Sequence, residues 1–155
     1  MLDVGSPVPD IELEDTEGNL VRLRELGAGQ PVLVYFMRAI NCAQCNAHVR
    51  MLTSQAGDFA AKGVRVVVSV PDSRADAAAW KARKKVPFAV LTGERGAAHA
   101  EFGLLRKIFG AVQQSGTALI DAHGVVAYIH GGTNPSASYD REATALAVSK
   151  LLSAA

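Results

Sequence analysis

The chain has 155 residues, of which 49% are hydrophobic and 20% are charged. This length is typical of one ordinary globular domain, so we expect a single domain over residues 1–155. Sixteen basic and fifteen acidic side chains give a formal net charge of +1. A protein with so little excess positive charge has no general attraction for polyanions, so we expect no nucleic-acid partner.

The apolar stretches are too short to cross a membrane. The longest run of large apolar residues, Val32–Met37, has six residues, whereas a transmembrane helix needs about 20. The N-terminal Met1–Gly5 lacks both the basic and the apolar region of a signal peptide. We therefore expect no leader peptide, no membrane partner and a cytoplasmic location, where thiols stay reduced.

The first part of the chain predicts a hairpin, a buried strand and a long helix. Turn-forming residues 15–19 separate the alternating segment Ile11–Glu14 from Leu20–Leu23, which is typical of a hairpin. The continuous apolar run Pro31–Phe36 predicts a strand covered on both faces. Residues 42–62 have helical spacing of apolar side chains, and we expect Asn41 to be the N-cap.

The rest of the chain alternates strands and helices. We expect strands over Val64–Val70 and Val86–Leu91, helices over Arg74–Lys85 and Ala97–Phe102, a hairpin of Thr117–Ile120 and Val125–Ile129 around the turn Asp121–Gly124, and a helix over Tyr139–Leu152. Residues 104–115 give no clear pattern. The early alternation predicts parallel strands and the late hairpin adds antiparallel ones. The predicted fold is an α/β fold with a mixed central sheet, helices on both faces and an N-terminal hairpin.

The two cysteines, Cys42 and Cys45, carry the strongest chemical signal. They begin a helix directly after a buried strand, where free N–H groups and the positive end of the helix dipole stabilise a thiolate. We therefore expect lowered thiol pKa values. Their spacing puts both sulfurs on one helix face, where a disulfide can form and reopen. Zinc needs four ligands and no second C-x-x-C exists, so we expect no metal.

Several segments resemble those of one family in order and spacing. They are Gly5–Asp10, the hairpin after it, Val64–Asp72, Val86–Leu91, Glu101–Leu104 and Thr117–Val125. With the cysteine pair, they resemble the thioredoxin superfamily and, more closely, its peroxiredoxin-like branch, the alkyl hydroperoxide reductase and thiol-specific antioxidant family. The resemblance implies a thioredoxin-like fold and a thiol peroxidase that reduces hydrogen peroxide or organic hydroperoxides. It further implies no bound cofactor, a thioredoxin-like protein or small thiol as reductant, and a homodimer, which many peroxiredoxins form.

The alignment of the two cysteines with the family leaves their roles open. Cys45 falls on the peroxidatic cysteine of peroxiredoxins and on the buried cysteine of thioredoxins, while Cys42 falls on the peroxiredoxin threonine and the thioredoxin nucleophile. If a peroxide is the substrate, Cys45 attacks, becomes a sulfenic acid and is resolved by Cys42. If a protein disulfide is the substrate, Cys42 attacks and Cys45 resolves. The flanking segments favour the peroxidase, with Cys45 peroxidatic.

The chain departs from the family pattern at three places. The motif proline is absent near Met37 and Arg38, the distal arginine is replaced by residues of Gln113–Gly116, and Gly116 precedes Thr117 where thioredoxins have a cis-proline. Arg38 is then the nearest cation in sequence that could lower a thiol pKa or polarise a peroxide bond.

Two other functions remain open at this point. One is a thiol–disulfide oxidoreductase with Cys42 as nucleophile, and the other is a non-enzymatic redox sensor, because a fold does not fix a function. His48, one turn beyond Cys45, is expected to be an exposed helix histidine with a lesser claim as a proton donor. Trp80 is expected to be buried in the core or helix packing.

Overall fold

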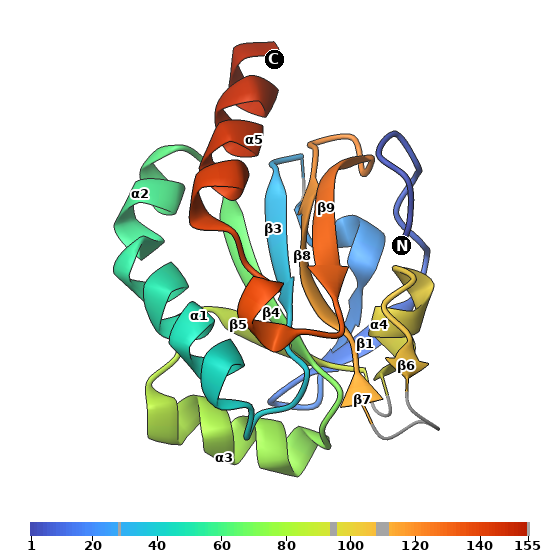
Figure 1. Ribbon diagram of the computed structural model, residues 1–155, viewed down its shortest axis with the longest axis vertical. Helices are drawn as coiled ribbons and strands as arrows, with labels where there is room; N and C mark the ends of the chain where they lie inside the picture. Colours follow the sequence, from blue (N-terminus) through green and yellow to red (C-terminus); the bar gives the residue numbers. More distant parts are fainter. Residues whose placement is uncertain (28, 94–95, 108–111, 155) are drawn as a thin grey trace.

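A seven-stranded mixed sheet forms the centre of the computed structural model, which describes residues 1–27, 29–93, 96–107 and 112–154 (Figure 1). The strand order is β2-β1-β5-β4-β3-β8-β9. The strands are β1 (Glu12–Asp15), β2 (Leu20–Arg22), β3 (Val32–Phe36), β4 (Arg65–Val70), β5 (Ala89–Thr92), β8 (Ser115–Ile120) and β9 (Val126–Gly132). β3, β4 and β5 are parallel, whereas the pairings of β1 with β2 and β5, and of β8 with β3 and β9, are antiparallel. The predicted mixed sheet is confirmed.

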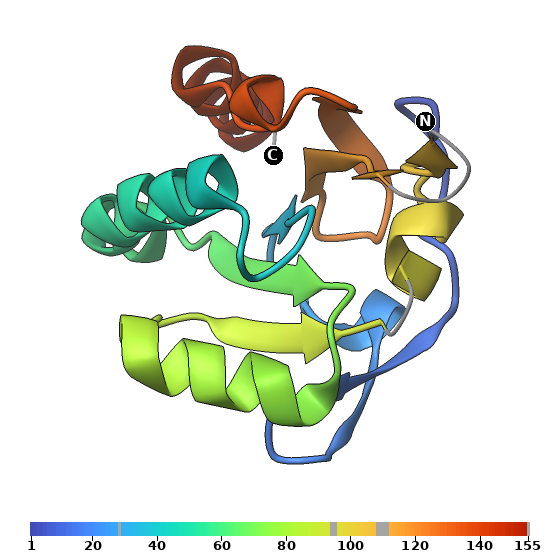
Figure 2. The ribbon, with the colours of Figure 1, turned by 60° about the horizontal axis from the view of Figure 1, so that its bottom comes forward.

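Helices cover both faces of this sheet, as predicted. The helices are α1 (Ala43–Ser54), α2 (Ala56–Ala61), α3 (Arg74–Lys84), α4 (Ala97–Glu101) and α5 (Arg141–Ala154), with short 3-10 helices η1 (Leu23–Glu25) and η3 (Pro135–Ala137). α4 lies across the sheet from α1 and α5 (Figures 1 and 2). In the described parts of the chain, no helix is long and apolar enough to cross a membrane.

Side chains of β3 alternate between two hydrophobic cores. Leu33 and Tyr35 pack into one core with α1, α2, α3 and α5, while Val32, Val34 and Phe36 pack into the other with η1 and α4. All five side chains are buried, as a strand covered on both faces requires. The first core also contains Trp80 and Cys45, so the expected burial of Trp80 is confirmed.

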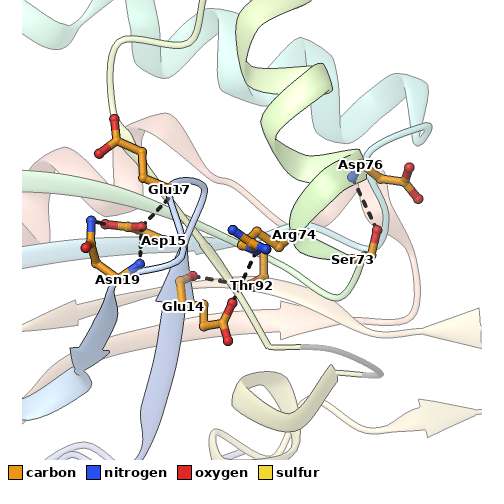
Figure 3. A network of polar contacts seen from close by, with 8 residues as sticks. All are labelled: Glu14, Asp15, Glu17, Asn19, Ser73, Arg74, Asp76 and Thr92. Atoms are coloured by element: carbon orange, nitrogen blue, oxygen red, sulfur yellow. Dashed lines mark hydrogen bonds and ion pairs between the residues drawn. The ribbon is translucent and has the colours of Figure 1, made fainter.

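The N-terminal hairpin forms one edge of the sheet and is anchored by polar contacts (Figure 3). In its turn, the Asp15 carboxylate accepts hydrogen bonds from the backbone N–H groups of Glu17 and Asn19, both at 2.9 Å. The Arg74 guanidinium at the start of α3 lies 3.5 Å from the Glu14 carboxylate. The turn chemistry predicted over residues 15–19 is therefore confirmed.

The single helix predicted over residues 42–62 is wrong, because the helix breaks at Gln55 into α1 and α2. Just before the break, the Thr53 hydroxyl donates to the Val49 carbonyl at 2.8 Å and the Ser54 hydroxyl to the Met51 carbonyl at 2.6 Å. Hydroxyls that bond back to carbonyls of the preceding turn compete with the helix ladder and bend it.

The other boundaries differ by a few residues. The strand predicted over Val86–Leu91 begins only at Ala89, because Lys85 turns into the left-handed region (φ 53°) and the chain needs Val86–Phe88 to reach the sheet. The unassigned stretch 104–115 contains a separate two-stranded ladder of β6 (Arg106–Lys107) and β7 (Val112–Gln113). Residues 108–111 lie outside the described part of the chain.

Candidate active site

Cys42 is the N-cap of helix α1. Its backbone is extended (φ −71°, ψ 114°), and its sulfur accepts a hydrogen bond from the Cys45 N–H at 3.3 Å. A side chain that accepts from the third helical residue is the usual form of N-cap. The prediction that Asn41 caps the helix is wrong, because Asn41 lies one residue before the cap and is exposed.

Two polar side chains hold the loop that connects β3 to this cap. The Asn46 amide donates to the carbonyls of Ile40 (2.9 Å) and Cys42 (2.8 Å), and it accepts from the Trp80 indole N–H at 2.8 Å. The Asp72 carboxylate, after β4, accepts from the Ile40 N–H at 3.0 Å. Sequence reasoning missed both roles, since neither residue belongs to the cysteine motif.

The two sulfurs differ in their access to solvent. Cys42 is half-buried and lines a surface hollow of about 490 Å³ together with Arg38, Asn41, Ala43, Gln44 and Pro135. Cys45 is 0% exposed and belongs to the hydrophobic core. Both cysteines are free in this structure. A reagent that enters from solvent therefore meets Cys42 first.

Burial raises the pKa of the Cys45 thiol to about 12, and a hydrogen bond and charge repulsion from Cys42 add to the rise. The Arg38 backbone and the Tyr35 hydroxyl form hydrogen bonds that act in the opposite direction. The expected lowering of the thiol pKa is therefore wrong for Cys45. Desolvation of a thiolate in the core outweighs the amide groups of the first helical turn.

The Arg38 side chain is half-buried and lines the same hollow as Cys42. Within the described residues, no ion pair or side-chain hydrogen bond engages its guanidinium. The structure thus brings together the three side chains named from the sequence: Cys42 and Arg38 at the hollow, and Cys45 directly behind Cys42. The guanidinium is free to bind an anion or a polar oxygen there.

A cluster of hydroxyl and imidazole groups lies behind Cys45. The Tyr35 hydroxyl lies 2.9 Å from His48 Nδ1 and 2.7 Å from Ser138 Oγ, and Tyr35 is buried in the same core as Cys45. The expectation of an exposed His48 is wrong, because the ring is half-buried against Tyr35 and Tyr139. Sequence reasoning missed Tyr35 and Ser138, and the only signal was a hydroxyl inside an apolar strand.

A family model described as the AhpC/TSA family matches residues 4–129 of the chain. The chain belongs to this family. The expected family resemblance is confirmed, and the thioredoxin-like fold of its peroxiredoxins agrees with the observed sheet.

The AhpC/TSA-family chain is similar to proteins of two named activities. Rice (Oryza sativa subsp. japonica) chloroplastic peroxiredoxin Q is 30% identical over 126 residues, which are 81% of this chain and 58% of the rice protein. Thiol:disulfide interchange protein DsbE of Escherichia coli is 31% identical over 132 residues, which are 83% of this chain and 65% of DsbE. The chain thus spans less than two thirds of the length of either relative.

Solved structures support the same fold for this AhpC/TSA-family chain. Peroxidoxin BcpB of Mycobacterium tuberculosis superposes with a TM-score of 0.82 at 24% identity, covering 99% of this chain and 98% of BcpB. At that identity the likeness concerns the fold.

The described residues just before Thr117 include no arginine, so this chain lacks the distal guanidinium of the family pattern there. The Gln113 amide is buried and donates to the Leu104 carbonyl at 2.7 Å. Gly116 pairs with Phe36 in the sheet, and a Cβ there would collide with the His130 carbonyl. This position therefore has no room for a larger residue. Among the described residues, no group of three or more His, Cys, Asp or Glu side chains is placed to hold a metal ion.

Proposed function

We propose that the chain is a thiol-dependent peroxidase that reduces hydrogen peroxide or an organic hydroperoxide through Cys42 and Cys45. The observation that carries this proposal is the pair itself. Cys42 has a half-buried sulfur at a hollow shared with Arg38, and this sulfur accepts a hydrogen bond from the backbone N–H of the buried Cys45. Membership of the AhpC/TSA family and the likeness to peroxiredoxin Q support the same activity. No bound cofactor is required, because the dithiol supplies both electrons.

Within this proposal, Cys42 is the attacking thiol and Cys45 the resolving one. The family register assigned these roles the other way round. Exposure and ionisation favour Cys42 as the first attacker. Cys45 is inaccessible to solvent and its pKa is raised, whereas Cys42 faces the hollow. Only the thiolate is nucleophilic, so a neutral buried thiol is a poor first attacker.

The chemistry then proceeds in two steps. The Cys42 thiolate attacks one peroxide oxygen, the O–O bond breaks, and water or an alcohol leaves after protonation. Cys42 is then a sulfenic acid. The Cys45 sulfur attacks the Cys42 sulfur, the S–O bond breaks, and water and a disulfide form. A thioredoxin-like protein or a small thiol restores the dithiol by exchange.

Arg38 is the proposed electrostatic helper of the first step. Its guanidinium lies at the hollow beside Cys42 and can donate hydrogen bonds to both peroxide oxygens as negative charge develops on the leaving one. The cytoplasmic location and the homodimer stay predictions. The reductant, a thioredoxin-like protein or a small thiol, is likewise a prediction.

Stopped-flow mixing of the reduced protein with hydrogen peroxide tests this function. We expect Cys42→Ser to abolish the rapid oxidation, and Cys45→Ser to keep it but to accumulate a sulfenic acid on Cys42 that dimedone traps. If wild type reacts no faster than free cysteine, the protein is not a peroxidase. If Cys42→Ser reacts like wild type while Cys45→Ser does not, the order of attack is the reverse.

A thiol–disulfide oxidoreductase is the second candidate, because an exposed first cysteine and a buried second one also suit disulfide exchange. Likeness to DsbE supports it. Rapid insulin reduction, with Cys45→Ala trapped as a mixed disulfide and negligible peroxide turnover, would favour this function. A non-enzymatic redox sensor would instead show ordinary alkylation rates at both cysteines.

A further inference from the structure

The hollow at Cys42 combines a cation with neutral polar groups and contains no acid. It is formed by the loop after β3, the start of α1 and η3, and α1 and η3 lie side by side (Figure 1). Its volume of about 490 Å³ is that of a small-molecule site. Its lining residues are Arg38, Asn41, Cys42, Ala43, Gln44 and Pro135. We propose that this hollow binds the reductant of the oxidised protein, and that the reductant is a small thiol whose carboxylate is held by Arg38.

Arg38 is the group that binds the carboxylate in this proposal. Its side chain is half-buried, and in the described part of the chain no acidic side chain pairs with it. A guanidinium without a partner in the protein can form a bidentate pair with a carboxylate of a ligand. The inference deepens the proposed function, because it names the class of reductant and rests on a Cys42–Cys45 disulfide as the oxidised form.

The start of α1 adds to the positive potential of the hollow. The first intrahelical hydrogen bond runs from the Asn46 N–H to the Cys42 carbonyl at 2.9 Å, so the N–H groups of Ala43 and Gln44 have no partner within the helix. The first turn of α1 contains no acidic residue that would offset the helix dipole. The guanidinium and the helix terminus therefore both favour an anion in the hollow.

The acidic residue that contacts the cysteine loop is not part of the hollow. Asp72 accepts a hydrogen bond from the Ile40 N–H at 3.0 Å and interacts with the positive charge of Arg106. The lining contains one arginine and no other charged residue, so its formal charge is +1 when Cys42 is in a disulfide. An anionic thiol is therefore attracted to the hollow and a cationic thiol is repelled.

The lining favours a small thiol over a docked protein as the reductant. The centre of a protein–protein interface is poor in charged residues and contains large apolar anchors. The hollow offers a guanidinium and two carboxamides instead, and no exposed large apolar side chain of the described residues lines it. Those exposed apolar residues are Met1, Val4, Leu20, Met51, Leu105 and Leu146.

Reduction takes two exchange steps in which atoms and electrons balance. The thiolate of one reductant molecule attacks the Cys42 sulfur, which lines the hollow, and the S–S bond to Cys45 breaks. Cys45 leaves as a thiolate and takes up a proton. A second reductant thiolate attacks the sulfur of the bound reductant, and Cys42 leaves as a thiolate. Two thiols are oxidised to one disulfide, and the protein disulfide is reduced to the dithiol.

A charge series of small thiols tests the site without any peroxide. The protein is oxidised to the Cys42–Cys45 disulfide with diamide and is then reduced by excess thiol. Acid quenching, alkylation and mass spectrometry give the rate constant, which is expressed per thiolate. The series consists of 3-mercaptopropionate with a carboxylate, 2-mercaptoethanol without a charge and cysteamine with an ammonium group. The measured quantity is the rate constant for mercaptopropionate divided by that for mercaptoethanol.

We expect this ratio to be about tenfold higher in wild type than in Arg38→Gln, because the variant loses the partner of the carboxylate. The ratio removes any effect that the substitution has on both thiols alike, and it removes the different intrinsic reactivities of the thiols when variants are compared. For cysteamine, the corresponding ratio to mercaptoethanol should rise in Arg38→Gln, since a repulsive charge is lost.

Two further variants accompany Arg38→Gln. Arg50→Gln removes an exposed arginine of α1 that does not line the hollow, so it is the matched control and should keep the wild-type ratio. Asn41→Asp adds an acid to the lining at an exposed position with almost the same side-chain shape. It should lower the ratio about threefold or more, because the added charge opposes that of Arg38.

The salt dependence separates charge attraction from the shape of the hollow. In wild type, the ratio should fall as the NaCl concentration rises from about 0.05 M to about 0.5 M, because salt screens the charge of a half-buried guanidinium. In Arg38→Gln the ratio should change much less over the same range. A purely structural role of Arg38 predicts the same salt dependence in both proteins.

Three results overturn the inference. One is an equal ratio in wild type, Arg38→Gln and Asn41→Asp, and another is an equal fall of the ratio in Arg50→Gln and Arg38→Gln. The third is rapid reduction by a bacterial thioredoxin without any charge preference among the small thiols, which identifies a protein reductant. If Arg38→Gln fails to fold by circular dichroism, Asn41→Asp and the salt dependence of wild type decide. A protein that is inert to peroxide but shows the predicted ratios keeps the thiol site and loses the peroxidase function.

Discussion

At the residue scale, Asn46 connects the cysteine loop to the rest of the core. It is buried, and its amide bonds both to the loop carbonyls and to the Trp80 indole. Together with Asp72, which accepts from the Ile40 N–H, this side chain fixes the shape of the loop. Removing a buried amide leaves its former partners unpaired, which costs more than the bonds themselves contribute.

Asn46→Ala should lower the free energy of unfolding by about 2–4 kcal/mol, because the Trp80 N–H and the Ile40 carbonyl lose their partner. Urea denaturation followed by tryptophan fluorescence measures this. The exposed neighbour Asn41→Ala should stay within about 0.5 kcal/mol of wild type. Equal stabilities of the two variants would contradict the role of Asn46.

Arg38→Gln should slow oxidation of the protein by hydrogen peroxide about 100-fold, because the hollow loses its charged donor. Arg50→Gln, an exposed arginine of α1, is the matched control and should have no effect. The second-order rate constant from stopped-flow fluorescence is the measurement. A rate for Arg38→Gln equal to that of Arg50→Gln would remove Arg38 from the mechanism.

The sequence predicted the residues of the site better than their contacts. The cysteine pair at a helix start could be recognised because the helix and its preceding strand are local patterns. The contact between Tyr35 and Ser138 could not, since 103 positions separate them. The raised pKa of Cys45 was also out of reach, because it depends on the packing of the core around α1.

At the element scale, β8 and β9 approach each other closely at a pair of glycines. A Cβ on Gly131 would lie 2.5 Å from the Ser115 carbonyl oxygen and 2.9 Å from the Gly116 Cα. The adjacent Gly132 has nothing within 4 Å of its Cβ position. Nothing in the sequence distinguishes these two glycines. Their different surroundings follow from the register of β8 and β9.

Gly131→Ala should lower the stability by about 1–3 kcal/mol, since the backbones of β8 and β9 must move apart. Gly132→Ala, one residue further along the same strand, should be neutral or slightly stabilising, because alanine restricts the unfolded chain without a clash. Thermal unfolding of the two variants measures the difference. Equal midpoints would show that the strands adjust without cost.

Strand and helix types were predicted well, while their ends were not. The continuous apolar run of β3 and the β-branched run of β4 are buried on both faces, so composition alone identifies them. The break at Gln55 depends on the hydroxyls of Thr53 and Ser54, which donate hydrogen bonds to carbonyls of the preceding turn. The same residues are compatible with a continuous helix, so periodicity could not reveal the break.

At the scale of the whole molecule, stability in acid should depend on one buried histidine. His99 in α4 is 0% exposed, and its Nε2 lies 2.7 Å from the Met37 carbonyl oxygen. Burial lowers the pKa of His99 to about 4. The unfolded chain takes up this proton near pH 6.5, and the folded chain only near pH 4. The stability is therefore lost as the pH falls between these two values.

Wild type should lose roughly 1.4 kcal/mol of unfolding free energy per pH unit through that window, beyond the shared acid response. His99→Gln keeps a donor to the Met37 carbonyl but does not titrate, so its profile should be flatter. His123→Gln, at an exposed turn, should follow wild type. Urea unfolding at several pH values is the measurement. Parallel profiles for His99→Gln and wild type would exclude His99.

The Cys42 sulfur both caps α1 and, in the proposed mechanism, reacts. A thiolate accepts a hydrogen bond from a backbone N–H more strongly than a disulfide sulfur does, so formation of the disulfide should weaken the cap that the Cys42 sulfur provides for the Cys45 N–H. A substitution that strengthens the hydrogen bond between the Cys45 N–H and a Cys42 thiolate stabilises the reduced form. By thermodynamic linkage, it should therefore raise the reduction potential of the pair. We therefore expect the start of α1 to be less firmly capped in the disulfide form, which would give a reductant a feature by which to distinguish the two forms.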